Sequence, residues 1–371
     1  MKTWQKVLII ILSLCLIAGY FAFDAFFIAP RRITTRRTDL TNVKIPNQLD
    51  DVQILFFADL DYGTYVDEAR AQTLIDHINN LAPDVVIFGG DLYDTDAIPN
   101  ENENEQISRL FRQIKAPLGK FAVLGDSDAR DEETAAAMVR VLNNGDFEVL
   151  RNQSINLHNT GSQSITLVGL DSGLSGFNAE QAYSTVSHTA YVIAVCHTPD
   201  SALSVPADLT DYFLAAHSHA GQVWYLFGSL YEQPMAEQFF RGKTNIDNQF
   251  ILDVSSGFGT RMYDVRFLTS CEVAVYTLHN LVIQEEVKLE TETPAEQPTE
   301  EPAENEPPAE EDNDVWSEAY DESETFEYYG GEEETTEDIP TEEPPAEEPV
   351  EEPTEEPAPE EAPAENSEQT E

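Results

Sequence analysis

The chain has 371 residues, of which 70 are acidic and 20 basic, and its formal net charge at pH 7 is −50. The phosphates of DNA and RNA repel such a chain, so the charge argues against a nucleic-acid polymer as a partner. Three cysteines are too few for a framework of disulfide bonds, and we expect them to behave as small hydrophobic side chains.

An apolar segment opens the chain. Residues 7–23 are an uncharged run of 17 residues, and the run continues to Ala29 past a single charge, Asp24. A helix rises about 1.5 Å per residue, so this segment is long enough to cross the hydrocarbon core of a bilayer. The alternative, a cleaved signal peptide, would have a shorter apolar region and a small-residue cleavage site. We predict a single-pass membrane anchor at residues 1–29 and a juxtamembrane segment at residues 30–47.

Residues 48–288 are sufficient for one large domain, whose first half alternates strands with helices. Continuous apolar runs predict buried strands at 53–57, 85–88 and 121–124, with a helix at 67–81 after the first. Asp59, Asp91 and Asp126 follow these strands at intervals of 32 and 35 residues, the length of one strand–helix–strand unit. Because parallel strands end at one edge of their sheet, these carboxylates should lie close together.

Shorter strands follow a predicted helix at 132–142. Apolar runs place them at 147–150, 155–157, 165–170, 191–196, 212–215, 250–254 and 272–278. Two sheets with helices outside accommodate these strands better than one doubly wound sheet. The predicted fold class is therefore α/β, a four-layer α/β/β/α sandwich.

Histidines join the aspartates at the strand ends. His197 follows one predicted strand, and His217 and His219 follow the next. A single Asp after a strand is often a helix N-cap or turn residue, and a single buried His is often structural. Carboxylates and imidazoles at the ends of several strands, however, are what a two-metal phosphoryl-transfer site requires.

The turns that carry these residues resemble the motifs of the calcineurin-like metallophosphoesterases, including membrane-anchored bacterial members. These turns are Ala58-Asp59-Leu60-Asp61, Gly90-Asp91-Leu92-Tyr93-Asp94, Gly125-Asp126-Ser127-Asp128, Cys196-His197-Thr198-Pro199 and His217-Ser218-His219. The resemblance covers residues 50–278 and implies the same sandwich fold. It also implies that Asp59 and His219 bind one divalent metal ion, that His197 and His217 bind a second, and that Asp91 bridges both.

Three positions depart from the family pattern. Asp61 and Asp126 stand where the family has His and Asn, and by resemblance they complete the first and the second metal site. Four carboxylates bring two divalent cations close to neutral and favour Mn²⁺ or Mg²⁺ over Zn²⁺. Ser127 stands where the family has its catalytic His, and a hydroxyl is a poor general acid. We therefore assign no catalytic residue from the sequence.

By resemblance, the chain is a metal-dependent phosphoesterase that hydrolyses a phosphate mono- or diester, or a pyrophosphate, by a metal-bound hydroxide. The predicted anchor favours an envelope- or lipid-linked substrate. Anchored relatives favour an extracytoplasmic domain, although the arginines that follow the anchor favour a cytoplasmic one. The alternative is a catalytically impaired pseudoenzyme of the same fold, a membrane-anchored binding or scaffold protein.

The composition changes abruptly after Lys288. No Lys or Arg follows it, whereas 34 of the acidic residues and 13 of the 21 prolines do. Such a segment cannot bury enough apolar surface to offset the entropy of ordering it. We predict a disordered, Pro/Glu-rich acidic tail at residues 289–371. Aromatic residues within 315–329 are either a docking motif for a partner or only a more apolar piece of linker.

Overall fold

The computed structural model describes residues 2–281, apart from residues 96, 98, 226, 227 and 230. The predicted acidic tail, its aromatic residues and the last residues of the predicted domain lie outside this range. The helices are α1 (Thr3–Phe23), α2 (Glu68–Leu81), α3 (Glu101–Arg112), α4 (Glu132–Asn144) and α5 (Ala179–Tyr183). The strands are β1 (Ile33–Asn42), β2 (Gln53–Phe57), β3 (Val85–Phe88), β4 (Gly119–Ala122), β5 (Glu148–Val149), β6 (Gln153–Leu157), β7 (Ile165–Leu170), β8 (Val192–Cys196), β9 (Tyr212–Ala215), β10 (Trp224–Tyr225), β11 (Gly228–Ser229), β12 (Gly242–Ile246), β13 (Phe250–Val254) and β14 (Cys271–Asn280).

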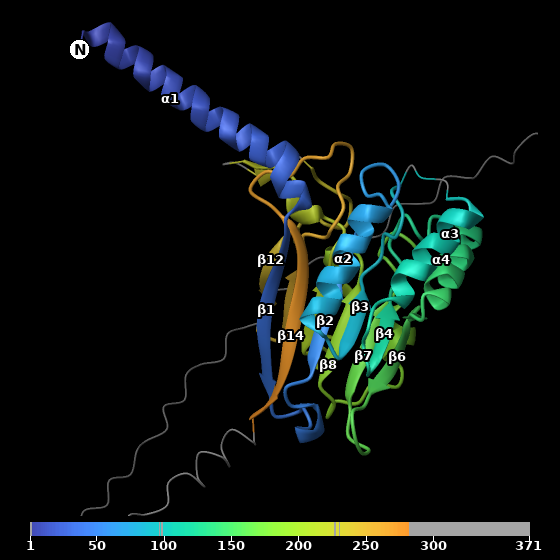
Figure 1. Cartoon of the computed structure of the whole chain (residues 1–371). Coiled ribbons are helices and arrows are strands. Elements are labelled where there is room, and N and C mark those ends of the chain that lie inside the picture. Colours follow the sequence, from blue (N-terminus) through green and yellow to red (C-terminus); the bar gives the residue numbers. More distant parts are fainter. Residues whose placement is uncertain (1, 96, 98, 226–227, 230, 282–371) are drawn as a thin grey trace, which may run out of the picture. The chain divides into compact units, whose positions relative to one another are not determined.

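Within the described residues, these strands form two six-stranded sheets and a small hairpin, β10–β11 (Figure 1). The first sheet has the order β1-β14-β2-β3-β4-β5, and the second has the order β12-β13-β9-β8-β7-β6. In the first sheet β2 to β5 run parallel, and in the second β7, β8, β9 and β13 do. The turns that carry the predicted metal ligands follow strands of these parallel sets.

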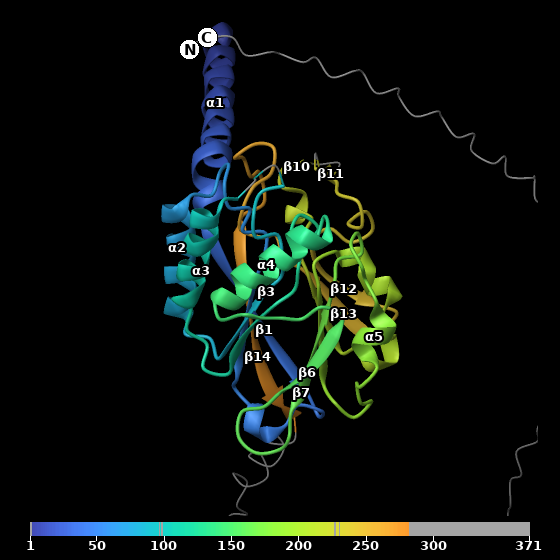
Figure 2. The ribbon, with the colours of Figure 1, turned by 90° about the vertical axis from the view of Figure 1, so that its right-hand side faces the viewer.

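Alternation of side chains along the strands produces the layers. Leu55 and Phe57 of β2 pack into one core under α2, α3 and α4, whereas Ile54 and Phe56 pack into a second core that faces Ile193 of the other sheet. A third core covers the outer face of the second sheet and includes residues of α5. Figure 2 shows α2 and α3 on one side of the two sheets and α5 on the other. The predicted four-layer α/β/β/α sandwich is confirmed.

Short polar side chains start the helices of the outer layer. Asp67 accepts a hydrogen bond from the backbone N–H of Arg70 at the start of α2, and Asp131 does the same for Thr134 in α4. Asn100 and Glu103 form a reciprocal capping box at the start of α3. Each of these helices therefore begins at the residue that follows its cap, after the turn that leaves the edge of the sheet.

Strand β1 differs from the sequence-based prediction. Ile33–Asn42 lie in the segment predicted as juxtamembrane, yet they pair in parallel with β14 over ten positions. Their sequence is rich in Thr and Arg rather than apolar residues, as suits a strand at the edge of a sheet. A continuous apolar run, the pattern that predicts a buried strand, is therefore missing from this segment. Arg36 of β1 donates to the buried Asp253 Oδ2 at 2.7 Å. Residues of the predicted juxtamembrane segment thus form an edge strand of the first sheet.

The N-terminal helix leads into the body through a π-helical segment, Asp24–Ile28, and a 3-10 turn, Ala29–Arg31. Within the helical stretch Thr3–Arg31 an 18-residue window has a mean hydropathy of 2.4, so the stretch is long and apolar enough to cross a membrane. Its end is attached to one loop of the body: the Ala25 carbonyl accepts from the N–H of Arg266 at 3.0 Å, and Arg31 pairs with Asp264 at 2.9 Å. The rings of Phe21 and Phe267 also meet edge to face.

Candidate metal centre

The seven predicted ligands gather where the parallel strands of both sheets end. Asp59, Asp91 and Asp126 follow β2, β3 and β4, and the histidines follow β8 and β9. Every one is fully buried except Asp126, whose side chain is 22% exposed. Five of the seven hold a left-handed backbone with φ between 46° and 68°, a costly conformation at functional sites; they are Asp59, Asp61, Asp91, His217 and His219.

Four of these residues form one tight group, which we call the His197 half. The ligand atoms of Asp91, Asp126, His197 and His217 all lie within 4.8 Å of one another. His197 Nε2 lies 3.0 Å from Asp91 Oδ2 and 3.3 Å from Asp126 Oδ1. His217 Nδ1 lies 2.9 Å from the same oxygen of Asp126. Distances of this size suit four atoms that share one cation.

Backbone carbonyls orient both imidazoles of the His197 half. His197 Nδ1 lies 2.7 Å from the carbonyl oxygen of Gly89, and His217 Nε2 lies 2.9 Å from that of Pro234. A proton on each of these nitrogens leaves the other ring nitrogen free to face the centre. Metal-bound histidines are commonly held by such outer partners.

The remaining ligands form a looser group, which we call the His219 half. His219 Nε2 lies 3.6 Å from Asp61 Oδ2, and Asp59 Oδ1 accepts from the N–H of His217 at 3.2 Å. Arg261 lies among them: its Nε is 3.4 Å from Asp61 Oδ1, and its Nη2 contacts Asp91 Oδ2. The same oxygen of Asp91, Oδ2, therefore meets both His197 and the guanidinium.

Arg261 is the functional residue that the sequence analysis missed. It lies 200 residues from Asp61 along the chain, and its side chain is only 8% exposed. The available signal was the glycine turn that precedes it. A Cβ on Gly257, whose φ is 65°, would lie 2.1 Å from Asp59 Oδ2, and one on Gly259 would lie 2.6 Å from Asp61 Oδ2. This close approach brings the turn, and hence Arg261, against the ligands.

Unpaired ligand atoms show that the residues fit metal ions. The buried atoms without a hydrogen-bond partner among the described residues include Asp59 Oδ2, Asp61 Oδ2, Asp126 Oδ1, His197 Nε2, His217 Nδ1 and both ring nitrogens of His219. A buried polar atom left unpaired costs about 1–3 kcal/mol, so a folded protein rarely keeps so many in one place. Divalent cations would satisfy these oxygens and nitrogens together.

The two halves differ in charge. Burial alone raises the pKa of Asp91, but His197 and Arg261 outweigh it and hold that pKa well below its usual range. At Asp126 burial is likewise opposed by the adjacent imidazoles of His197 and His217, and the imidazoles prevail, so the pKa of Asp126 is also lowered. At Asp61 burial prevails and raises the pKa despite Arg261. The His197 half thus carries stable carboxylates, whereas Asp61 still lacks sufficient positive charge.

Ser127 and Asp128 support Asp91. Ser127 Oγ donates to Asp91 Oδ1 at 2.6 Å, and its N–H donates to the same oxygen at 3.1 Å. Asp128 accepts from the N–H groups of Asp91, Leu92 and Gly125 at 2.8–3.0 Å. Burial and the neighbouring Asp91 raise the pKa of Asp128 to about 6. Ser127 therefore positions a carboxylate, and its hydroxyl is already committed.

Comparisons with known proteins agree with this geometry. The profile of the calcineurin-like phosphoesterase family matches residues 52–221. The metallophosphoesterase YkuE of Bacillus subtilis, described as uncharacterized, is 28% identical over 257 residues, which are 68% of this chain and 88% of that protein. The UDP-2,3-diacylglucosamine pyrophosphatase LpxG of Chlamydia muridarum is 23% identical over 241 residues, 52% of this chain and 71% of that protein.

The name of a further relative describes a transmembrane protein. The transmembrane protein with metallophosphoesterase domain of Danio rerio is 24% identical over 268 residues, which are 65% of this chain and 55% of that protein. This chain thus matches about half of that protein. Together with the strand-end ligands, the matches identify the family of one region: residues 52–221 match the calcineurin-like phosphoesterases.

Proposed function

We propose that this chain hydrolyses a phosphate ester with divalent cations held by Asp59, Asp61, Asp91, Asp126, His197, His217 and His219. The observation that carries the proposal is the close group of Asp91, Asp126, His197 and His217, whose ligand atoms lie within 4.8 Å of one another. In three of these four residues, Asp126, His197 and His217, the buried ligand atom has no hydrogen-bond partner among the described residues. Bound cations would neutralise the phosphate and lower the pKa of a water molecule. Hydrolysis adds the hydroxyl of water to phosphorus and the proton to the leaving oxygen.

The protein's own residues organise this reaction. Asp91 faces both halves of the centre, and Ser127 holds it in place through two hydrogen bonds. Arg261 adds donors for phosphate oxygens, and a planar guanidinium binds such oxygens in pairs. Ser127 offers no proton of suitable acidity to the leaving oxygen. We therefore propose that the enzyme favours esters whose leaving group needs little protonation, such as pyrophosphates or aryl diesters.

We further propose Mn²⁺ or Mg²⁺ rather than Zn²⁺ as the metals. Four of the seven ligands are carboxylates, and oxygen ligands suit these harder cations. Matched samples loaded with each metal, compared in hydrolysis rate and in metal content after dialysis, test this preference. Zinc retained preferentially, with the higher rate, would contradict it.

A membrane location is also part of the proposal. The helix Thr3–Arg31 would span the bilayer once, and the catalytic domain would lie outside the cytoplasm. The transmembrane relative supports an anchored domain, and the pyrophosphatase relative supports an envelope- or lipid-linked substrate. Protease access in spheroplasts of an expressing strain tests the orientation: cleavage of the domain by external protease supports an outward position.

The same site allows a second candidate, a pseudoenzyme. Ser127 replaces the residue expected to be the acid, and Arg261 lies where it can compete with a cation for Asp61 and Asp91. In this case the domain would bind metal or phosphate, and the acidic tail would supply contacts with a partner.

One experiment separates the two candidates. The purified full chain is analysed for bound metal and for hydrolysis of bis(p-nitrophenyl) phosphate with added Mn²⁺. Turnover that is lost in Asp91→Asn and kept in the exposed control Asp76→Asn supports the enzyme. Bound metal without turnover, with turnover gained in Ser127→His, supports the pseudoenzyme. If the protein binds no metal, the enzyme fails, and so does a pseudoenzyme that acts by binding metal.

A further inference from the structure

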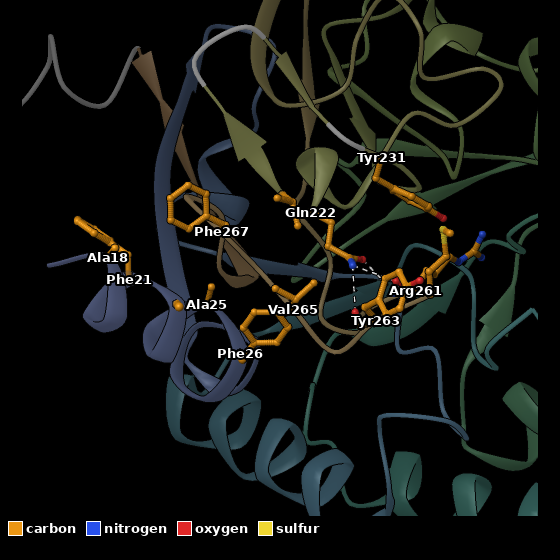
Figure 3. Close-up of a pocket in the computed structure, with 13 residues that line it drawn as sticks. Ala18, Phe21, Ala25, Phe26, Gln222, Tyr231, Arg261, Tyr263, Val265 and Phe267 are labelled. Carbon is orange, nitrogen blue, oxygen red and sulfur yellow. Dashed lines mark hydrogen bonds between the residues drawn. The ribbon is translucent and has the colours of Figure 1, made fainter. Parts of the chain in front are cut away.

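An apolar cavity adjoins the metal centre. Its volume is about 700 Å³, and it lies between the end of α1 and the loop that follows Arg261 (Figure 3). Phe21, Ala22 and Phe26 line it from the helix, and Val265 and Phe267 line it from the loop. Cavities of this size and character are typical of sites that bury most of an apolar ligand.

One end of this cavity is polar and belongs to the catalytic site. Arg261 lines it and contacts Asp61 and Asp91. Tyr231 also lines it, and its ring packs edge to face on the ligand His219 with centroids 5.8 Å apart. Figure 3 shows Tyr231 and Arg261 at the end opposite Ala18, Phe21 and Phe26. An apolar chain in the cavity would therefore point its anionic end at the metal centre.

A second pocket begins where the first one ends. It has a volume of about 300 Å³ and shares Tyr231, Arg261 and Met262 with the apolar cavity. Its other lining residues carry hydroxyl or carboxylate groups; they are Thr64, Tyr65, Asp94 and Thr95. The shared residues thus separate an apolar space from a polar one, beside the metal ligands.

The rim of the cavity suits a membrane surface. Met262, Tyr263 and Leu268 of the loop are 58–69% exposed, and Phe26 and Phe27 at the end of the helix are 54% and 62% exposed. Large apolar side chains exposed together mark a surface that water does not normally cover. The loop and the anchor helix meet here through the Arg31–Asp264 and Arg266–Ala25 contacts.

We propose that the cavity holds the hydrocarbon chain of a membrane lipid whose phosphate ester reaches the metal centre from the bilayer. The polar part of that lipid beyond the phosphate occupies the second pocket, where hydroxyl and carboxylate groups recognise a hydroxyl-bearing headgroup. This inference rests on the proposed phosphoesterase function and names its substrate class. The lipid need not leave the membrane plane, because the anchor helix itself forms one wall of its site.

A pair of substrates with one leaving group tests the proposal. The full chain in lipid nanodiscs, with Mn²⁺, is assayed with the methyl and the hexadecyl p-nitrophenyl phosphodiesters. The value of kcat/KM is measured for each substrate. Ala22→Trp fills the cavity, and Trp is well tolerated at a membrane interface. Leu16→Trp, an exposed position that does not line the cavity, is the matched control.

We expect the hexadecyl-to-methyl ratio of kcat/KM to fall at least about tenfold in Ala22→Trp, because the chain loses its buried methylene contacts. The ratio should remain at the wild-type value in Leu16→Trp. Equal ratios in all three proteins would overturn the cavity as the chain site. Loss of the ratio in both variants would overturn it too, since partition into the bilayer would then explain the preference.

A second readout does not depend on turnover. A phosphate diester whose acyl chain carries a diazirine is irradiated with the full chain in nanodiscs, and the labelled peptides are identified by mass spectrometry. Label at Val265 or Phe267, lost in Ala22→Trp and kept in Leu16→Trp, supports the inference. Label confined to lipid-facing positions of α1 contradicts it. Label at the loop without any hydrolysis would refute the phosphoesterase function and leave the lipid site standing.

Discussion

The two halves of the metal centre compensate the charge of their buried carboxylates in different ways. In the His197 half, the unusual carboxylate Asp126 lies against two imidazoles and keeps a lowered pKa. In the His219 half, the unusual carboxylate Asp61 has a single imidazole at 3.6 Å and relies on Arg261. Asp126 is compensated by imidazoles of its own half, whereas Asp61 relies on a cation from elsewhere in the chain.

This difference changes the charge expected from the ligands alone. The sequence contains four carboxylates at the centre, which bring two divalent cations close to neutral. Arg261 is buried beside them and adds one positive charge that the ligand positions do not reveal. An anionic substrate therefore meets a more positive site than the ligand set suggests. Substitutions in each half test whether the two halves differ in this way.

The largest effect should come from the residue that both halves share. Asp91→Asn removes the charge that contacts both His197 and Arg261. We expect hydrolysis of bis(p-nitrophenyl) phosphate to fall by at least about 10²–10³-fold, the usual cost of losing one electrostatic contact at a reacting centre. Steady-state kinetics at saturating Mn²⁺ measure this. A loss below tenfold would mean that Asp91 is not at the reacting centre.

Removing one imidazole from each half should separate them. His217→Ala is expected to weaken Mn²⁺ binding by at least about 10²-fold, since even outer partners of a ligand are worth 10- to 100-fold. His219→Ala should weaken it by less than about tenfold, because Arg261 already compensates charge in that half. Titration calorimetry of each variant, with its melting temperature as the folding control, checks this order. Equal losses would remove the distinction between the halves.

Arg261→Met should strengthen metal binding in the His219 half rather than weaken it. Without the guanidinium, Asp61 and Asp91 attract a cation more strongly, so we expect the affinity of the His219 half for Mn²⁺ to rise at least about tenfold. Metal content after dialysis and titration calorimetry report this rise. Arg261→Lys, which keeps the charge, is the control. Lower metal content in Arg261→Met would show instead that the arginine holds the ligands in place.

The smallest effect concerns Ser127. Ser127→Ala removes the hydroxyl that donates to Asp91 Oδ1, while the backbone N–H still donates to the same oxygen. We expect the free energy of unfolding to fall by about 1–2 kcal/mol, the usual worth of one hydrogen bond to a charged group. Urea denaturation measures it, with Ser127→Thr as the control that retains a hydroxyl. An unchanged stability with lost activity would indicate a direct chemical role.

Much of the fold follows from local patterns in the sequence. Continuous apolar runs indicated β2, β3, β7, β8 and β9, because strands buried on both faces leave no other residue types. The edge strand β1 was not predicted, because Ile33–Asn42 are rich in Thr and Arg and lack a continuous apolar run. Its place in the sheet follows from pairing with β14, which lies more than 200 residues away in the chain. Pairing over that separation leaves no local signal.

Local patterns in the sequence predict the two-sheet fold and the residues that gather at its strand ends, because parallel strands end at one edge of their sheet. How those residues divide into two groups follows from the tertiary structure. It placed Asp126 between two imidazoles, Arg261 against Asp61, and the end of α1 over an apolar cavity beside them. Each of these contacts joins segments far apart in the chain, so burial and charge pairing in the folded state, not local spacing, establish them.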